Sequence, residues 1–340
     1  MSGYRSIKKL EVGEKITQVF LVASIEGRTT KAGKPYARVV LKDKGGQITL
    51  SLWDFDPKDF SEFVAGVYAQ MTIEIEDYRG ARQAKSRVMP MIVAPPSDPS
   101  DYESDLGLSL EQSEYFYEKL MEYKNKVTNV FIKTYLDVIF DNKATKDKFI
   151  TAPASVSNRG AYRGGLVEHT FKVMLNAAGI MASQAQAKDP APIDFDIIIA
   201  GVLCHDLGKM YSYSIDSTGP SFTRSGMLLE HLPMSYGISV QSFIQAEGVL
   251  RRPIPEEIKD HIHHCILAHH GRLDYGSPVK PRSVEAQIVH IADMADSTSS
   301  CFAELTRDGL DRIDDNGFVE GSWITSKTLY VGDKASDEKK

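Results

Sequence analysis

The sequence contains few cysteines and no long hydrophobic run. Only three cysteines occur in 340 residues, Cys204, Cys265 and Cys301, and they lie far apart. An odd, dispersed set excludes a disulfide framework and a four-cysteine zinc knuckle, and it indicates a reducing compartment. No apolar stretch approaches the roughly 20 residues that span a bilayer, and the N-terminal segment lacks the apolar core of a signal peptide. These absences predict a cytoplasmic protein that does not associate with membranes.

Histidine is absent from the first 168 residues, and all 9 histidines follow. Charge is also divided unevenly. Residues 1–94 carry 15 basic and 11 acidic side chains, whereas the remainder carries 25 basic and 35 acidic ones. A slightly basic front part joined to an acidic remainder is compatible with a nucleic-acid-binding module attached to a second domain. The length of the chain is sufficient for two domains.

Residues 1–94 show the period-two alternation of β-strands. Five strand-like runs are separated by turn residues, and a short helix is expected at residues 56–63, between the third and fourth runs. This order predicts an OB-fold, a small all-β barrel that often binds oligonucleotides. Tyr36, Trp53 and Tyr78 are candidates for stacking on bases, and Arg79 and Arg82 for contacting the strand's backbone. Alternation of the third strand favours a core position for Trp53 over a ligand contact, and both interpretations stay open.

The remaining chain divides into a linker, a helical domain and a tail. Residues 95–112 are rich in proline, serine and acidic residues, which is typical of a linker, and Ser109 with Gln112 forms a capping-box pattern that begins a helix. Residues 113–325 show mainly helical periodicity, and residues 326–340 are a polar segment expected to be flexible. The sequence therefore predicts a multidomain protein, with a small all-β OB-fold barrel followed by a mostly α-helical domain.

Three polar residues, His205, Asp206 and Lys209, follow directly after an apolar helical segment. Burying an unpaired carboxylate is costly, whereas a bound cation removes that cost. Imidazole and carboxylate together suit divalent ions such as Mn²⁺, Fe²⁺, Co²⁺ or Zn²⁺. A salt bridge between Asp206 and Lys209 is the alternative interpretation, and this segment alone does not distinguish the two.

Other apolar helical segments also carry an inward histidine or aspartate. His169 has apolar neighbours three and four residues away, and His269 shares the apolar stripe of its segment. His231 and Asp293 lie in further segments, and His270 follows His269 at the end of its helix, where a cation also suits the helix dipole. A single buried histidine is usually structural. Four apolar helices that each carry an inward-facing histidine or aspartate form a pattern that favours a metal site.

The order of these residues resembles the HD superfamily of metal-dependent phosphohydrolases. The motifs HDLGK at 205–209, LAHHG at 267–271 and YRGGLVEHT at 162–170, together with the strand-like runs, more closely resemble the YhaM-type bacterial 3′–5′ exoribonucleases. Those enzymes join an N-terminal OB-fold to an HD domain. The resemblance extends over roughly residues 10–300.

This resemblance implies two divalent ions that share one carboxylate. The implied ligands of the first ion are His169, His205, Asp206 and Asp293, and those of the second are Asp206, His231, His269 and His270. Mn²⁺ is favoured, with Fe²⁺, Co²⁺, Ni²⁺, Zn²⁺ and Mg²⁺ as alternatives. Asp206 and Lys209 are implied catalytic residues, Lys209 through contact with a phosphate oxygen.

The implied activity is metal-dependent 3′–5′ exonuclease action on single-stranded RNA, with single-stranded DNA as a further substrate, releasing nucleoside 5′-monophosphates. One alternative is an HD phosphodiesterase or phosphohydrolase of small or cyclic nucleotides. A non-catalytic protein with an inactive HD domain is disfavoured because every implied ligand is present. Arg159 stands with Gly160 where relatives often have a His-His pair, so Arg159 is a candidate substrate contact. The sequence leaves open whether the chain forms a homo-oligomer.

Overall fold

The computed structural model describes residues 4–43, 46–78, 81–96, 107–156, 160–190, 192–216, 219–309, 314, 316–320 and 328–332. The chain divides into two compact units, one of Met1–Leu106 with Ile215–Gly219 and one of Gly107–Ser214 with Pro220–Lys340. None of the helices in the described ranges combines the length and the apolarity needed to cross a bilayer.

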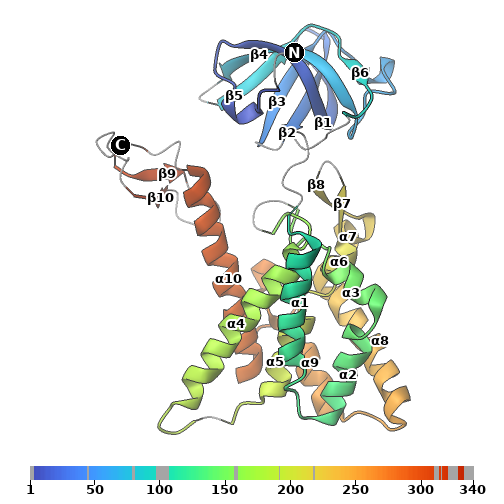
Figure 1. Cartoon of the computed structure of the whole chain (residues 1–340), viewed down its shortest axis with the longest axis vertical. Helices are drawn as coiled ribbons and strands as arrows, with labels where there is room; N and C mark the ends of the chain where they lie inside the picture. The colour runs from blue at the N-terminus through green and yellow to red at the C-terminus, as the bar shows by residue number, and fades with distance from the viewer. Residues whose placement is uncertain are drawn as a thin grey trace. The chain divides into compact units, whose positions relative to one another are not determined.

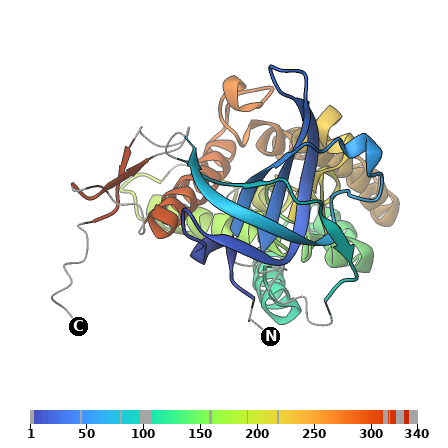
Figure 2. The same cartoon turned by 90° about the horizontal axis from the view of Figure 1, so that it is seen from above.

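The first unit is a closed β-barrel whose strands curve around a common interior (Figures 1 and 2). Hydrogen bonds join the strands in the order β1, β2, β3, β5, β4, and β4 pairs back with β1. The strands are β1 (Lys15–Thr29), β2 (Pro35–Asp43), β3 (Gly46–Trp53), β4 (Tyr68–Tyr78) and β5 (Ala81–Ser86), with β6 (Met91–Val93) beside β4. This is the predicted OB-fold barrel. The helix expected between the third and fourth strands is reduced to one 3-10 turn, η2 (Pro57–Asp59).

Alternation along the strands fills the barrel. Val39, Leu41, Leu50 and Leu52 are fully buried, and every second residue of β2 and β3 points inward with them. The long strand β1 pairs with β4 over its first half and with β2 over its second, and its register shifts between Val22 and Ser24. Such a bulge bends a strand, which lets β1 close the barrel.

Helices dominate the second unit. In chain order they are α1 (Leu110–Lys124), α2 (Val130–Phe140), α3 (Lys143–Phe149), α4 (Gly165–Ala185), α5 (Phe195–Cys204), α6 (Lys209–Ser212), α7 (Arg224–Leu229), α8 (His231–Leu250), α9 (Glu256–Ala268) and α10 (Val284–Gly309). The predicted capping box is present, because Ser109 and Gln112 each bond the other's backbone N–H. Helix α1 therefore begins inside the segment 95–112 that the sequence assigned to a linker.

Two short strand pairs interrupt the expected helical pattern. They are β7 (Tyr213–Asp216) with β8 (Gly219–Phe222), and β9 (Phe318–Glu320) with β10 (Thr328–Tyr330). Strands of three or four residues are too short to show a period in the sequence. Strand β10 lies in the segment 326–340 expected to be a flexible tail, and it pairs with β9 at the C-terminal end of α10 (Figures 1 and 2).

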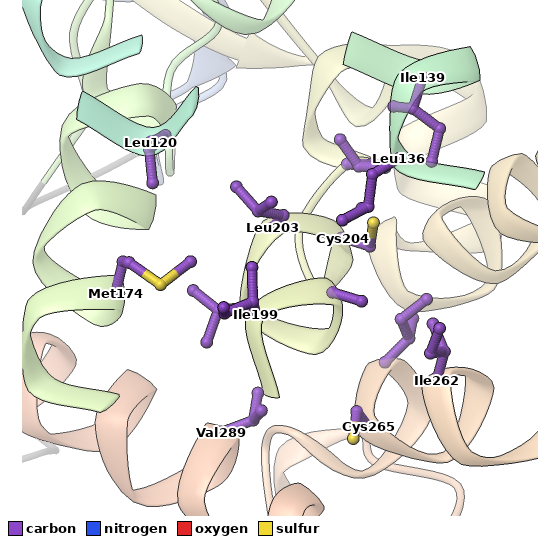
Figure 3. Packing of buried hydrophobic residues seen from close by; sticks show 14 of the residues in the cluster. Leu120, Leu136, Ile139, Met174, Ile199, Leu203, Cys204, Ile262, Cys265 and Val289 are labelled. Atoms are coloured by element: carbon purple, nitrogen blue, oxygen red, sulfur yellow. The ribbon is translucent and has the colours of Figure 1, made fainter. Parts of the chain in front are cut away.

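Helix α5 lies at the centre of the helical core (Figure 3). Every residue from Ile197 to Cys204 is buried, as expected for a helix that is apolar on all sides. A Cβ atom on Gly201 would lie 2.9 Å from Cys265 Cβ and 3.1 Å from Val289 Cγ2, so this glycine allows α9 and α10 to approach closely. Packing around α5 thus fixes the position of its C-terminal end, where His205 and Asp206 follow.

Candidate metal centre

Four histidine side chains surround the carboxylate of Asp206, which is only 2% exposed. Its Oδ2 atom lies 3.3 Å from Nε2 of His169 on α4 and 3.2 Å from Nε2 of His205 at the end of α5. Its Oδ1 atom lies 3.4 Å from Nε2 of His231 on α8 and 3.6 Å from Nε2 of His269 after α9. Residues from four helices therefore converge on one carboxylate.

The candidate ligands form two groups that Asp206 connects. In each group, one nitrogen or oxygen atom of every residue lies within 4.8 Å of the others. The first group is His169, His205 and Asp293, and the second is His231, His269 and His270. Asp206 forms a third group of this kind with His205 and His269, so it is adjacent to both. The structure thus brings together all seven residues implied as ligands.

Backbone carbonyls fix the orientation of three of these imidazoles. The Nδ1 atoms of His205 and His269 each lie 2.7 Å from the carbonyl oxygen three residues earlier, and Nδ1 of His270 lies 2.6 Å from the carbonyl oxygen of Tyr275. A carbonyl oxygen only accepts hydrogen bonds, so each Nδ1 carries the proton and donates it. Each Nε2 therefore presents a lone pair toward the centre, as metal-binding histidines do.

The imidazole of His169 is oriented by a carboxylate instead of a backbone carbonyl. Its Nδ1 atom lies 2.7 Å from Oδ2 of Asp296 on α10, and Ser300 donates a hydrogen bond of 2.8 Å to the other carboxylate oxygen. No role for Asp296 followed from the sequence. The contact depends on how α4 and α10 cross, and the one available signal was the spacing of Asp293 and Asp296 on one side of a helix. A carboxylate behind a histidine increases its strength as a ligand.

Burial and neighbouring charges keep the centre in a state that accepts cations. Burial would raise the pKa of Asp206, but nearby positive charge, that of Lys209 first, outweighs it and holds that pKa well below its usual range. Burial lowers the pKa of His231 to about 3, and it lowers the pKa of His269 strongly. An ionised carboxylate beside neutral imidazoles is a donor set suited to a divalent ion.

His169 differs in its charge. Burial alone would lower its pKa, but the carboxylates of Asp206, Asp293 and Asp296, 2.7–3.3 Å from its ring nitrogens, outweigh that effect and raise the pKa to about 10. A cation that binds at His169 Nε2 must therefore displace a proton.

The alternative salt bridge is also present, since Lys209 Nζ lies 2.7 Å from Asp206 Oδ2. This salt bridge does not explain why the Nε2 atoms of four histidines face the same carboxylate. Within the described ranges, neither Asp206 oxygen accepts a hydrogen bond of ordinary geometry. Buried oxygens without such bonds fit a site for a cation.

Gly208 allows the turn after Asp206 to contact α8. A Cβ atom at this position would lie 2.1 Å from the carbonyl oxygen of His231. The Gly208 N–H instead donates a 2.8 Å hydrogen bond to Ser235 Oγ on α8. This close approach brings His231 beside Asp206.

The barrel places its candidate aromatic residues at the surface. The rings of Tyr36 on β2 and Trp53 on β3 stack with centroids 4.8 Å apart, and both side chains are partly exposed. Trp53 also lines a groove of about 380 Å³ with Lys85 and Arg87. The interpretation that placed Trp53 in the core is therefore wrong. Its ring packs on Tyr36 at the outer end of the strand pair.

The other nucleic-acid candidates lie in different surroundings. Tyr78 is 54% exposed at the end of β4. Arg82 donates hydrogen bonds to the carbonyl oxygens of Lys8 and Leu10, at 3.2 and 2.7 Å, and so holds the N-terminal segment on the barrel. Arg79 and Arg159 lie outside the described residues.

Comparison with known proteins matches part of the helical unit to a family model. Residues 166–297 match the family model described as "HD domain", and this range includes every candidate metal ligand. Several curated relatives carry the name 3'-5' exoribonuclease YhaM. The protein of Geobacillus sp. (strain WCH70) is 30% identical over 296 residues, which are 86% of this chain and 85% of the relative. That of Halalkalibacterium halodurans is 30% identical over 301 residues, 86% of each chain. That of Oceanobacillus iheyensis is 27% identical over 313 residues, 91% of each chain.

We expect Asp296→Asn to weaken metal binding about 10–100-fold, the usual effect of removing the group behind a ligating histidine. The asparagine amide retains the size of the side chain but not the charge that orients His169. Isothermal titration of metal-stripped protein with Mn²⁺ measures the change. Asp147→Asn, which alters an exposed carboxylate on α3, is the matched control. Equal affinities in the two variants would contradict a role for Asp296.

Proposed function

Because this chain belongs to the family of YhaM 3'-5' exoribonucleases, we propose that it shortens RNA from the 3′ end with divalent metal ions held by its histidine–aspartate cluster. This is the family that the sequence motifs resemble. One observation supports this proposal most directly: four histidine Nε2 atoms face the buried carboxylate of Asp206 at 3.2–3.6 Å. The proposed products are nucleoside 5′-monophosphates, and single-stranded DNA is a further proposed substrate.

We assign two ions to the centre because its ligands form two groups with Asp206 adjacent to both. His169, His205 and Asp293 would hold one ion, and His231, His269 and His270 the other. Mn²⁺ is the favoured metal, since it accepts both imidazole and carboxylate ligands. Two such ions lower the pKa of a water and neutralise charge on the entering and leaving oxygens of a phosphoryl group.

The protein's own residues would position and neutralise the substrate. Asp206, held ionised by its neighbours, is the shared ligand. Lys209 is 8% exposed and lies beside Asp206, so its ammonium group can contact a non-bridging phosphate oxygen at the edge of the centre. Charge that develops on such an oxygen during displacement is stabilised by a positioned cation.

We infer that the barrel holds the strand mainly through stacking. Lys85 contacts Glu74 and Glu76 at 3.1 Å, and Arg87 contacts Asp54 at 2.6 Å, so these basic groups are already compensated. The stacked pair of Tyr36 and Trp53 offers an aromatic surface that any base can use. Tyr78, Arg79, Arg82 and Arg159 remain further candidates for contact with the strand.

The direct test incubates 5′-labelled single-stranded RNA with the protein and Mn²⁺ and resolves the products on a gel. Stepwise action from the 3′ end gives a descending ladder of labelled fragments, with nucleoside 5′-monophosphates as the released product. A linear oligoadenylate and its cyclic counterpart are compared in parallel. Faster turnover of the ring would contradict the exonuclease and favour a phosphodiesterase of cyclic nucleotides.

Lys209→Ala should leave bound metal unchanged and lower the rate of hydrolysis about 10²–10³-fold, the scale of removing one group that stabilises transition-state charge. Metal content and single-turnover rates measure the two effects separately. Lys143→Ala removes an exposed lysine of α3 and is the control. Loss of metal from the Lys209 variant would show that this lysine supports the centre structurally.

Trp53→Ala should weaken binding of single-stranded RNA by about 1–3 kcal/mol, the contribution of one base–aromatic stack, and should spare hydrolysis of a small phosphodiester. Fluorescence anisotropy with labelled RNA measures the affinity. Tyr115→Ala, which removes an exposed ring of α1, is the control. Unchanged RNA affinity in the Trp53 variant would separate the barrel's aromatic surface from substrate binding.

A further inference from the structure

The Nδ1 atom of His231 lacks the partner that the other ligating histidines have. Nδ1 of His169, and of the three histidines oriented by carbonyls, lies 2.6–2.7 Å from an oxygen. Nδ1 of His231 is buried and, in the part of the chain that the structure describes, makes no hydrogen bond. A carboxylate oxygen, Oε2 of Glu230, lies 3.9 Å from it. This distance exceeds that of a hydrogen bond.

Glu230 adopts an unusual backbone conformation. Its φ of 61° and ψ of 166° fall in a region that is almost restricted to glycine. It is the single residue between α7 and α8, and His231 follows as the first residue of α8 (Figure 1). Strained residues of this kind persist where the surrounding structure requires them, and they concentrate at functional sites.

The surroundings of the Glu230 side chain give no structural reason for a glutamate at this position. The side chain is 63% exposed, so it does not fill the core. Among the described residues, His231 is the one basic side chain within 4 Å of its carboxylate. It caps no backbone N–H of α8 through its side chain. A glycine would adopt these backbone angles with less strain. The presence of a glutamate at position 230 is therefore best explained by a role of its carboxylate group.

We propose that Glu230 is a positioning residue for His231. Its carboxylate accepts the Nδ1–H of His231 and so directs Nε2 toward the second ion position, as Asp296 does for His169 at the first. The step requires the distance to shorten from 3.9 Å to the roughly 2.7–3.2 Å of a hydrogen bond. An exposed side chain can make this adjustment by rotating. The inference rests on the proposed two-ion centre.

This role makes the two ion positions unequal. The carboxylate behind the first position, Asp296, is 5% exposed and held by Ser300. The carboxylate behind the second is at the surface and has no such support in the described residues. The second ion is therefore held more weakly, and occupancy of its position depends on Glu230.

The test uses the full-length, metal-stripped chain and follows Mn²⁺ binding by isothermal titration. The natural protein should bind two ions with different affinities. Glu230→Gly should keep the tighter site and weaken the other about 10–100-fold, while its melting temperature rises because glycine relieves the backbone. Glu230→Gln should recover only part of that affinity, since an amide oxygen also accepts the Nδ1–H but lacks the charge of the carboxylate. Glu257→Gln, an exposed glutamate of α9, should match the natural protein.

Three results would overturn the inference. If the natural protein binds two ions and Glu230→Gly binds both with unchanged affinity, Glu230 has no role in the centre and the proposed function stands. If Glu230→Gly loses both ions and melts at a lower temperature, Glu230 is a structural residue. If the natural protein binds fewer than two ions, the two-ion centre fails and this inference fails with it.

Discussion

Asp206 carries a negative charge into the interior of the helical unit, and the arrangement around it depends on compensating that charge. An ionised carboxylate in a protein interior is destabilised by several kcal/mol unless cations or hydrogen bonds replace its water. Lys209 provides one positive charge at 2.7 Å, and protonated His169 provides a second at 3.3 Å. The imidazoles of His205 and His269 do not, because their protons are on Nδ1 and lone pairs on Nε2 face the carboxylate oxygens. Lone pairs that face one another at 3.2–3.6 Å are favourable only with cations between them.

The scaffold that holds these groups is built from ordinary packing. Helix α5 is surrounded by apolar side chains from its neighbours (Figure 3), so its C-terminal end cannot shift without opening the core. Gly201 and Gly208 bring α9, α10 and α8 close to the segment that carries His205 and Asp206. Precise placement of the candidate ligands therefore follows from apolar and glycine residues outside the candidate set.

The sequence was most informative where a period or a motif carries the signal. Alternation predicted the barrel strands. Inward histidines on apolar helices indicated a metal site, and the resemblance of the motifs to the HD superfamily implied the candidate ligands that converge on Asp206. Partnerships set by tertiary geometry had no such signal. Asp296 meets His169 only because α4 and α10 cross there, and Glu230 is distinguished by its backbone angles. Trp53 follows the buried Leu52 directly, so it lies on the outward side of β3, where its ring stacks on Tyr36.

The central claim is that Asp206 is shared by two divalent ions. Crystals of the full chain grown with Mn²⁺, with anomalous diffraction recorded at the manganese absorption edge, test it directly. We expect two anomalous peaks about 3.5–4 Å apart, one on each side of the Asp206 carboxylate, with His169 and His231 beside different peaks. A single peak, or Asp206 bonded only to Lys209 while the ions lie elsewhere, would contradict the account.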